Sequence, residues 1–332
     1  MIIVLDDAYR DGAAGRFAGH DVRYFPSNIK DPIALADIMR EADVVGFRRV
    51  LPFPFTSDMV TGAQTLKFIH RSGSGADWFD MDLLSRLGIL VAVNSGFNAP
   101  SVVEHTVLLT LLTLRRSLDF IASMREGKWL RDLPGDPPFM LNGRTVGVIG
   151  IGAIGSRVVQ AMLGLNAKVL CHQRDHEVGL PEGAKWADLD TIFSTADVIT
   201  LHVPLVSETE GIIGHRALGM MKPTTVVINT SRGQVVDQAA LIEALETRRI
   251  RGAGLDVFED EPLPPDHKLR HMPNVVTTPH VGGAGIEISE RQVEGTLSNI
   301  ELFLSGASPE RLVNSRTLKS ESLRARHLQI KD

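Results

Sequence analysis

The 332-residue sequence predicts an α/β fold built from two doubly wound, parallel-sheet domains. Short apolar runs typical of buried strands alternate with runs of helical spacing, first before residue 100 and again from residue 144 onward. A long helical stretch separates the two series, and another follows the second. This order predicts that residues 1–99 and 285–332 form one discontinuous domain, into which residues 100–284 are inserted as the other.

The first series predicts a parallel sheet, because strands that alternate with helices are joined by helical crossovers. The predicted strands are residues 2–5, 22–25, 44–47, 67–70 and 89–93, and the predicted helices between them are 32–41 and 78–87.

The second series contains predicted strands at residues 145–149, 168–171, 198–201, 226–229, 252–257 and 275–277. Before it, a helix is expected from about Pro100 to Arg125, because proline suits the first helical turn. After it, Leu297, Ile300 and Leu304 have helical spacing within a predicted helix at 286–304. The tail from residue 315 is rich in charged residues and serine, and we expect it to pack little.

The composition argues against several classes of partner. A net charge of −5 leaves no basic surface for nucleic acid. The 11 histidines are scattered without metal-ligand spacing, so no metal site is predicted. Residues 1–7 resemble a strand rather than a signal peptide, and the apolar run at 107–114 is too short to span a membrane. The single cysteine, Cys171, can form no internal disulfide, and we expect a cytoplasmic protein without membrane or nucleic-acid partners.

A glycine-rich segment, Gly150-Ile151-Gly152-Ala153-Ile154-Gly155, joins a predicted strand to a run of helical spacing. In this context the pattern predicts a dinucleotide-binding loop, and the alternative is a purely structural turn. Gly150 permits a tight turn, Gly152 lets the backbone approach the pyrophosphate, and Gly155 lets the helix pack closely on the strand. The helix N-terminus attracts the phosphates, because it offers unpaired N–H groups and the positive end of the helix dipole.

Three polar segments follow strands of the second series, at the edge where open α/β sheets bind ligands. Arg232 could bind a carboxylate through two parallel hydrogen bonds, or it could be an ordinary surface arginine. Glu261 precedes Pro262 in a stiff acidic loop that could aim it, although some carboxylates of this loop must be solvated. His280 lies between Pro279 and two glycines. Held by a carboxylate, it could exchange protons near neutral pH, although a single histidine is more often structural.

These segments together resemble the D-isomer-specific 2-hydroxyacid dehydrogenases, the family of D-lactate, D-glycerate and 3-phosphoglycerate dehydrogenases and of glyoxylate/hydroxypyruvate reductases. The resemblance extends from about residue 40 to residue 314. It rests on seven segments in family order: residues 73–77, 98–105, 150–155, 202–205, 229–233, 256–262 and 279–283. It implies two Rossmann-like domains, with the cofactor domain inserted in a discontinuous, flavodoxin-like substrate domain.

The resemblance also implies the role of each site residue. Arg232 would bind the substrate carboxylate and carbonyl, His280 would be the proton donor or acceptor, and Glu261 would raise the pKa of His280. The backbone of Ser74 and Gly75 would contact the substrate carboxylate. The residues implied to bind the cofactor are Thr106, Gly150, Gly152, Ala153, Ile154, Gly155, Gln173, Arg174, His202, Val203, Pro204, Thr230, Ser231, Asp256, His280 and Gly282.

The implied reaction is hydride transfer between a nicotinamide cofactor and a 2-keto or D-2-hydroxy acid, with glyoxylate or hydroxypyruvate reduced. D-3-phosphoglycerate or another D-2-hydroxy acid is the alternative substrate. Formate dehydrogenases of the family carry an amide where this sequence has Glu261, which argues against that activity. The non-enzymatic alternative is an NAD(H)-sensing corepressor, from which this sequence differs in lacking long disordered extensions.

The end of the second strand of the inserted domain indicates which cofactor is used. NAD sites usually place Asp or Glu about 20 residues after the glycines, where it accepts a hydrogen bond from the ribose 2′-OH. This sequence has Gln173 there, followed by Arg174, and a neutral residue beside an arginine accommodates a 2′-phosphate. The sequence therefore favours NADP. NAD is the alternative, because a small loop shift would bring Asp175 to the ribose.

Two further expectations concern apolar segments. Trp78 and Phe79 differ from the residues of many family members, and with Phe53-Pro54-Phe55 they either line the mouth of the substrate site or lie in the core. The segment 102–114 is rich in Leu, Val and Thr and is too extensive for one domain to cover, so a homodimer is expected.

Overall fold

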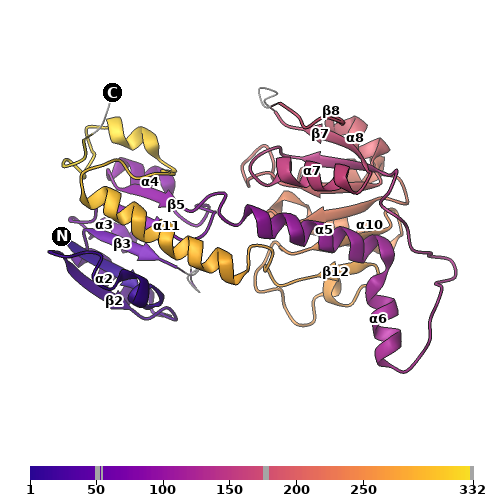
Figure 1. Ribbon diagram of the computed structural model, residues 1–332, viewed down its shortest axis with the longest axis horizontal. Coiled ribbons are helices and arrows are strands. Elements are labelled where there is room, and N and C mark those ends of the chain that lie inside the picture. The colour runs from indigo at the N-terminus through magenta and orange to yellow at the C-terminus, as the bar shows by residue number, and fades with distance from the viewer. Residues whose placement is uncertain (49–52, 54, 175–178, 330–332) are drawn as a thin grey trace. The chain divides into compact units, whose positions relative to one another are not determined.

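The computed structural model (Figure 1) describes residues 1–48, 53, 55–174 and 179–329. The chain divides into two compact units, which we call unit 1 (Met1–Asn98 with Gly285–Asp332) and unit 2 (Ala99–Ala284). Each unit is built around one parallel sheet with helices, so the predicted α/β fold class is confirmed. In the described part of the chain, no helix combines the length and the apolar character needed to cross a membrane.

Unit 1 contains a five-stranded parallel sheet in the order β2-β1-β3-β4-β5, which is the flavodoxin-like order. The strands are β1 Ile2–Asp6, β2 Asp21–Phe25, β3 Val44–Phe47, β4 Phe68–Arg71 and β5 Leu90–Val93. The helices are α1 Arg10–Ala13, α2 Pro32–Glu41, α3 Asp58–Thr61, α4 Met81–Arg86 and α11 Ile286–Leu304. The predicted helix 78–87 begins later, at Met81, because the Asp80 carboxylate caps it by accepting from Leu83 N at 2.8 Å.

The two faces of this sheet bury separate apolar cores, because successive strand residues point to opposite faces. On one face, Leu35 and Met39 of α2 are completely buried. On the other face, α11 lies along the sheet (Figure 1). There, the ring of Phe303 stacks on that of Phe68 of β4 with centroids 4.9 Å apart. This contact explains why apolar residues recur with helical spacing in 286–304.

The aromatic residues of unit 1 lie in and against its core. Phe79 is 6% exposed, and its ring centroid lies 4.9 Å from those of both Phe55 and Trp78. Phe53, Phe55 and Trp78 are partly buried against the same core. Within unit 1 this packing favours the core alternative for these residues; Pro54 lies outside the described residues.

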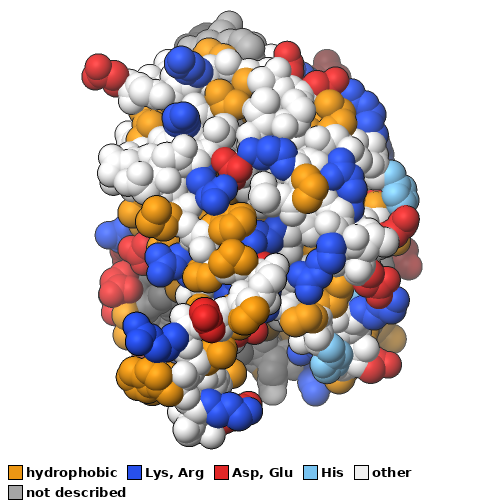
Figure 2. Space-filling model, turned by 90° about the vertical axis from the view of Figure 1, so that its right-hand side faces the viewer, with side chains coloured by type: hydrophobic (Ala, Val, Ile, Leu, Met, Phe, Trp, Pro, Cys, Tyr) orange, Lys and Arg blue, Asp and Glu red, His pale blue; other side chains and the backbone are white. Residues whose placement is uncertain are grey.

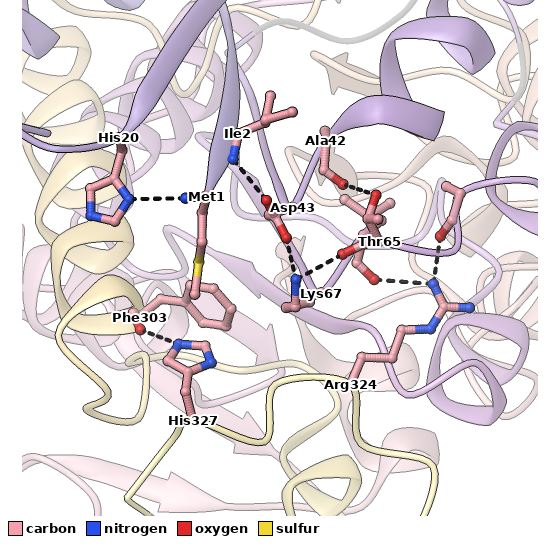
Figure 3. A network of polar contacts seen from close by, with 12 residues as sticks. Met1, Ile2, His20, Ala42, Asp43, Thr65, Lys67, Phe303, Arg324 and His327 are labelled. Carbon is pink, nitrogen blue, oxygen red and sulfur yellow. Dashed lines mark hydrogen bonds and ion pairs between the residues drawn. The ribbon is translucent and has the colours of Figure 1, made fainter.

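The described part of the C-terminal tail, residues 315–329, packs on the rest of unit 1, so the expectation that the tail packs little was wrong. After a short 3₁₀ helix at Ser315–Lys319, Leu323, Ala325 and Leu328 are at most 8% exposed. Arg324 Nη1 donates to the carbonyls of Ala63 (2.5 Å) and Leu66 (3.1 Å), and His327 Nε2 lies 2.8 Å from the carbonyl of Phe303 (Figure 3). These apolar residues alternate with charged ones, so the overall composition of the tail gave no indication that they are buried.

Unit 2 contains a seven-stranded parallel sheet in the order β12-β11-β10-β9-β6-β7-β8. The order reverses between β6 and β9, which is the Rossmann switch point where open α/β sheets bind ligands. The strands are β6 Thr145–Ile149, β7 Lys168–His172, β8 Ala184–Trp186, β9 Val198–Leu201, β10 Val226–Asn229, β11 Gly252–Leu255 and β12 Val275–Thr277. The helices are α5 Ala99–Arg115, α6 Ser117–Arg125, α7 Gly155–Gly164, α8 Leu189–Thr195, α9 His215–Met220 and α10 Gln238–Glu246.

The helix predicted from Pro100 to Arg125 is interrupted at Arg116, so α5 and α6 are separate helices. Arg116 has a left-handed backbone, with φ at 52°, and its guanidinium binds both Asp119 and Asp136. These ion pairs lie at the break between the two helices, where the sequence has no glycine or proline to indicate it.

Candidate active site

The glycine-rich segment forms the turn between β6 and α7. Gly150 has φ at 94°, and a side chain there would collide with the carbonyl of His202, 2.5 Å from an added Cβ. An added Cβ on Gly155 would lie 1.8 Å from the Gly150 carbonyl, so the helix and the strand meet too closely for any side chain. A Cβ on Gly152, by contrast, would meet no atom within 4 Å. The backbone at Gly152 is thus open to a ligand, which fits the approach of a pyrophosphate to a helix N-terminus.

Ala153 and Ile154 lead into α7, and Ile154 occupies the N-cap position without a side-chain cap. A polar cap would compete for the N–H groups of the first turn, so its absence suits an anion-binding helix terminus.

Gln173 follows the last residue of β7 and contacts this turn. Its Oε1 accepts a hydrogen bond from Ile151 N at 3.0 Å. The next residue, Arg174, has a side chain that is 85% exposed and pairs with Glu208 at 3.2 Å. Asp175, the acid that the NAD alternative needs, lies outside the described residues.

Arg232 is presented by a short turn that begins at the buried end of β10. Asn229 is 1% exposed; its Oδ1 accepts from Ser231 N (3.0 Å) and Ser231 Oγ (2.8 Å), and its Nδ2 donates to the Arg232 carbonyl at 2.8 Å. The side chain of Asn229 therefore fixes the backbone that carries Arg232. No role was predicted for Asn229 itself; an asparagine directly after an apolar strand is the signal that could have revealed it.

Gly233 brings the turn of Arg232 against the acidic loop. A Cβ on Gly233 would lie 1.9 Å from both the C and O atoms of Phe258. Any side chain there would push the two loops apart, and with them Arg232 and Glu261. The close contact between the two loops thus requires a glycine at position 233.

Glu261 and His280 form a hydrogen-bonded pair, with Glu261 Oε2 2.6 Å from His280 Nδ1. The other oxygen, Glu261 Oε1, accepts from Phe258 N at 3.1 Å, which holds the carboxylate in place.

The pair shifts the titration of both groups. The hydrogen bond from Glu261 raises the pKa of His280; burial opposes this rise, the charges of Glu261 and Asp256 add to it, and Arg232 reduces it. For Glu261, burial raises the pKa, but the hydrogen bond and charge of His280 outweigh burial, so the pKa of this carboxyl is lowered. The geometry thus favours a carboxylate beside an imidazolium.

The backbone of His280 is left-handed, with φ at 53°, and Asp256 holds it there. Asp256 follows β11 and is 2% exposed. Its carbonyl accepts from His280 N at 2.8 Å. Its carboxylate accepts from Val281 N at 2.9 Å and from Gly282 N at 2.7 Å. Such a conformation is costly for a residue with a side chain and persists only where the surroundings impose it. Asp256, predicted to face the cofactor, thus also shapes the loop that carries His280.

The other residues predicted to bind the cofactor lie in unit 2 as follows. The Thr106 side chain is fully buried and its Oγ1 lies 3.0 Å from Thr230 Oγ1. Burial lowers the pKa of His202 to about 3, so its ring is neutral at neutral pH, and its Nε2 lies 2.9 Å from Thr200 Oγ1. Val203 is partly buried and Pro204 is exposed.

The predicted substrate-contacting residues, Ser74 and Gly75, belong to unit 1. Ser74 Oγ donates to Asn98 Oδ1 at 2.8 Å, and the Gly75 carbonyl accepts from the guanidinium of Arg71. Their contact with a substrate carboxylate stays a prediction. Among the described residues, no group of three or more His, Cys, Asp or Glu side chains could hold a metal ion.

The chain is similar to known proteins over most of its length. Residues 107–282 match the family model described as D-isomer specific 2-hydroxyacid dehydrogenase, NAD binding domain. A glyoxylate reductase of Thermofilum pendens is 37% identical over 275 residues, which cover 80% of each chain. A hydroxypyruvate reductase of Thermotoga maritima is 37% identical over 262 residues, covering 77% of this chain and 83% of the relative. A crystal structure of a Thermus thermophilus protein, 30% identical, superposes with a TM-score of 0.84 over 94% of this chain and 100% of that one.

Proposed function

This chain belongs to the D-isomer-specific 2-hydroxyacid dehydrogenases, and from that membership we propose that it reduces glyoxylate or hydroxypyruvate with Arg232, Glu261 and His280 as its catalytic residues. The family consists of oxidoreductases that use a nicotinamide cofactor and act on a CH–OH group. The observation that carries the proposal is the 2.6 Å contact between Glu261 and His280. A histidine whose Nδ1 binds a carboxylate and whose pKa is raised can serve as a proton donor at neutral pH.

Each side chain then has a defined task. The bound nicotinamide supplies the hydride exchange with the substrate carbon. Arg232 holds the substrate carboxylate through its planar fork and stabilises the negative charge that develops on the carbonyl oxygen. Because Nδ1 of His280 is engaged by Glu261, Nε2 is the nitrogen that delivers a proton to this oxygen. Glu261 orients the ring and favours its protonated form.

A substrate panel tests the proposal. The purified protein is mixed with NADPH or NADH and with a set of 2-keto acids that includes glyoxylate, hydroxypyruvate and pyruvate, and oxidation is followed by nicotinamide absorbance. We expect the highest kcat/KM for glyoxylate or hydroxypyruvate. The reverse assay with D-glycerate and D-3-phosphoglycerate covers the alternative substrates. A preference for 3-phosphoglycerate would replace the proposed substrate, and no turnover in either direction would refute the proposed activity.

The pH dependence should report the Glu261–His280 pair. Reduction requires the imidazolium form, so kcat/KM should fall as the pH rises through the raised pKa of His280. Glu261→Gln removes the charge that raises this pKa, so the alkaline limb of the profile should move to lower pH. The variant should therefore lose more activity at about pH 8 than at about pH 6. Oxidation requires neutral imidazole and should show the opposite trend. An equal loss at every pH would contradict this role of Glu261.

We further propose NADPH as the preferred cofactor. A carboxylate at position 173 would repel a 2′-phosphate, whereas Gln173 is neutral and is held near the glycine turn by its bond from Ile151 N. Among the described residues, Arg174 pairs with Glu208 in an exposed ion pair, and exposed ion pairs are weak because water screens them. A phosphate can therefore replace Glu208 as the partner of Arg174 at small cost.

The expected preference for NADPH over NADH in kcat/KM is roughly ten- to a hundred-fold, because a charge-assisted hydrogen bond contributes about 1.5–3 kcal/mol. Gln173→Asp should erase or reverse the preference by placing a carboxylate against the 2′-phosphate. Gln234→Asp, a matched change in the same unit, should leave it unchanged. Equal or better use of NADH by the wild type would refute the proposal. Arg174 would then be a surface residue with no role in cofactor binding.

We also propose a homodimer, on a surface that differs from the one expected. The buried residues of α5 include Leu109 and Leu114, which pack within unit 2. Exposed apolar side chains of this region are instead Leu108 and a group on α6 and the segment after it: Leu118, Ile121, Met124, Trp129, Leu130 and Met140. Figure 2 shows apolar side chains interspersed with Arg and Lys on the face that it presents. Exposed apolar side chains mixed with arginines are typical of interfaces between subunits.

Light scattering should give about twice the 36.2 kDa chain mass at micromolar concentration. Replacing both Ile121 and Met124 by Asp should yield monomers, because charges would be buried in the interface. Ile33→Asp is the control, since Ile33 is 69% exposed in unit 1. A wild-type mass near that of one chain would exclude the dimer.

A further inference from the structure

Beneath the loop of His280 lies a buried chain of polar contacts from three separate elements of unit 2. Thr278, just after β12, places its Oγ1 2.5 Å from Asp256 Oδ1. His105, on α5, places its Nε2 2.8 Å from Thr278 Oγ1 and 3.3 Å from Asp256 Oδ1. The side chains of His105 and Asp256 are 12% and 2% exposed. Neither His105 nor Thr278 takes part in the proton transfer or substrate binding described above.

The direction of these hydrogen bonds follows from the donors available. A carboxylate can only accept, so the single hydroxyl hydrogen of Thr278 points to Asp256 Oδ1. The Thr278 oxygen must then accept from His105, so Nε2 of His105 carries a hydrogen. The sequence of donors is therefore His105 to Thr278 to Asp256. With the N–H groups of Val281 and Gly282, the carboxylate of Asp256 receives donors from both sides.

The loop cannot move independently of these side chains, because its backbone packs directly on them. A Cβ on Gly282 would lie 2.8 Å from Asp256 Oδ2 and 3.3 Å from His105 Cδ2, so the backbone sits directly on the two side chains. His280 N donates to the Asp256 carbonyl at 2.8 Å and to the Thr278 carbonyl at 3.1 Å. The left-handed backbone of His280 is thus determined by Asp256 and Thr278, and Asp256 is itself oriented by Thr278 and His105.

We infer that His105 and Thr278 are positioning residues for the reaction, which orient Asp256 so that the loop of His280 aims its imidazole at Glu261 and at the substrate. The inference rests on the proposed function of His280. Loss of the Thr278 hydroxyl removes one donor to the buried carboxylate of Asp256, and loss of His105 leaves the buried oxygen of Thr278 without its donor. Either loss is costly, and the loop relaxes to recover solvent or other donors. Small displacements of a catalytic group lower the rate strongly.

The test compares variants that differ in one hydrogen bond. Thr278→Val removes the hydroxyl at nearly constant volume, and Thr278→Ser restores it. His105→Leu removes the donor, and His105→Gln offers a side-chain amide N–H instead. Thr277→Val, on the neighbouring residue of β12, is the control. We expect Thr278→Val and His105→Leu to lower kcat about tenfold or more with the cofactor KM unchanged, and both conservative variants to restore most of it.

A second measurement distinguishes a positioning effect on His280 from a loss of protein stability and from a failure of the proposed function. NMR titration of labelled histidines, with the His280 signal assigned from the His280→Gln spectrum, reports the contact between His280 and Glu261. In Thr278→Val this pKa should fall towards the ordinary histidine value, whereas in Thr278→Ser and Thr277→Val it should stay raised. An unchanged pKa of His280 in Thr278→Val would overturn the inference, even if the melting temperature fell. Because the titration needs no substrate, it still decides the inference if the wild type reduces no 2-keto acid.

Discussion

Replacing His280 by Gln should lower turnover of the 2-keto substrate by about 100- to 10,000-fold, the usual contribution of a general acid–base group. Glutamine cannot supply a proton from an imidazolium, whereas the loop that carries residue 280 is held through its backbone by Asp256 and should keep its shape. The dissociation constant of the nicotinamide cofactor, measured by fluorescence titration, should therefore stay within a few-fold of the wild-type value.

The matched control is His215→Gln. His215 also lies near a carboxylate, 3.9 Å from Glu243, but its side chain is 70% exposed on the surface of unit 2. This change should leave turnover unaltered. If His280→Gln turned over substrate at close to the wild-type rate, His280 would be removed from the mechanism and the proton would have to come from water or another residue.

The features that could be predicted from sequence are those set by local pattern. Strands β3, β5, β9 and β10 bury every residue, so they appear in the sequence as short apolar runs that can be recognised without knowing their partners. The glycine turn could be predicted for a similar reason. The positive φ at Gly150 and the close contact at Gly155 both require glycine, so the sequence itself marks these two positions. By contrast, β8 is only three residues long and exposes Lys185, so no apolar run marks it.

The features that could not be predicted depend on contacts between distant segments. The break at Arg116 is accompanied by an ion pair with Asp136, 20 residues away. The tail is anchored by carbonyls of Ala63 and Leu66, more than 250 residues away. In the site, the resemblance to the family indicated Arg232, Glu261 and His280. Asn229, which positions Arg232, is only three residues away in the sequence, but Asp256 comes beside His280 only in the fold. Asn229 acts on Arg232 through a turn, and Asp256 acts on His280 across two strand ends.

Replacing Arg232 by Lys should lower kcat/KM for the 2-keto acid by roughly ten- to a hundred-fold, with both a higher KM and a lower kcat. Lysine keeps the positive charge but lacks the planar fork that gives two parallel hydrogen bonds to a carboxylate. The backbone at this position should not move, because Asn229 Nδ2 holds the carbonyl of residue 232 and Gly233 packs against Phe258. The loss of kcat/KM should therefore report the missing two-hydrogen-bond contact of the guanidinium and not a rearrangement of the turn.

Arg232→Gln removes the charge as well, and its loss should be larger, about 100-fold or more, because stabilisation of the developing oxyanion disappears too. The comparison of Lys with Gln thus separates geometry from charge at one position. Arg216→Lys is the control: its side chain is 70% exposed and its partner is Asp190, also on the surface. Steady-state kinetics over a range of 2-keto acid concentrations give the two constants. If kcat/KM of Arg232→Lys equalled that of the wild type, some other group would hold the carboxylate, and Arg232 would contribute no more than its charge.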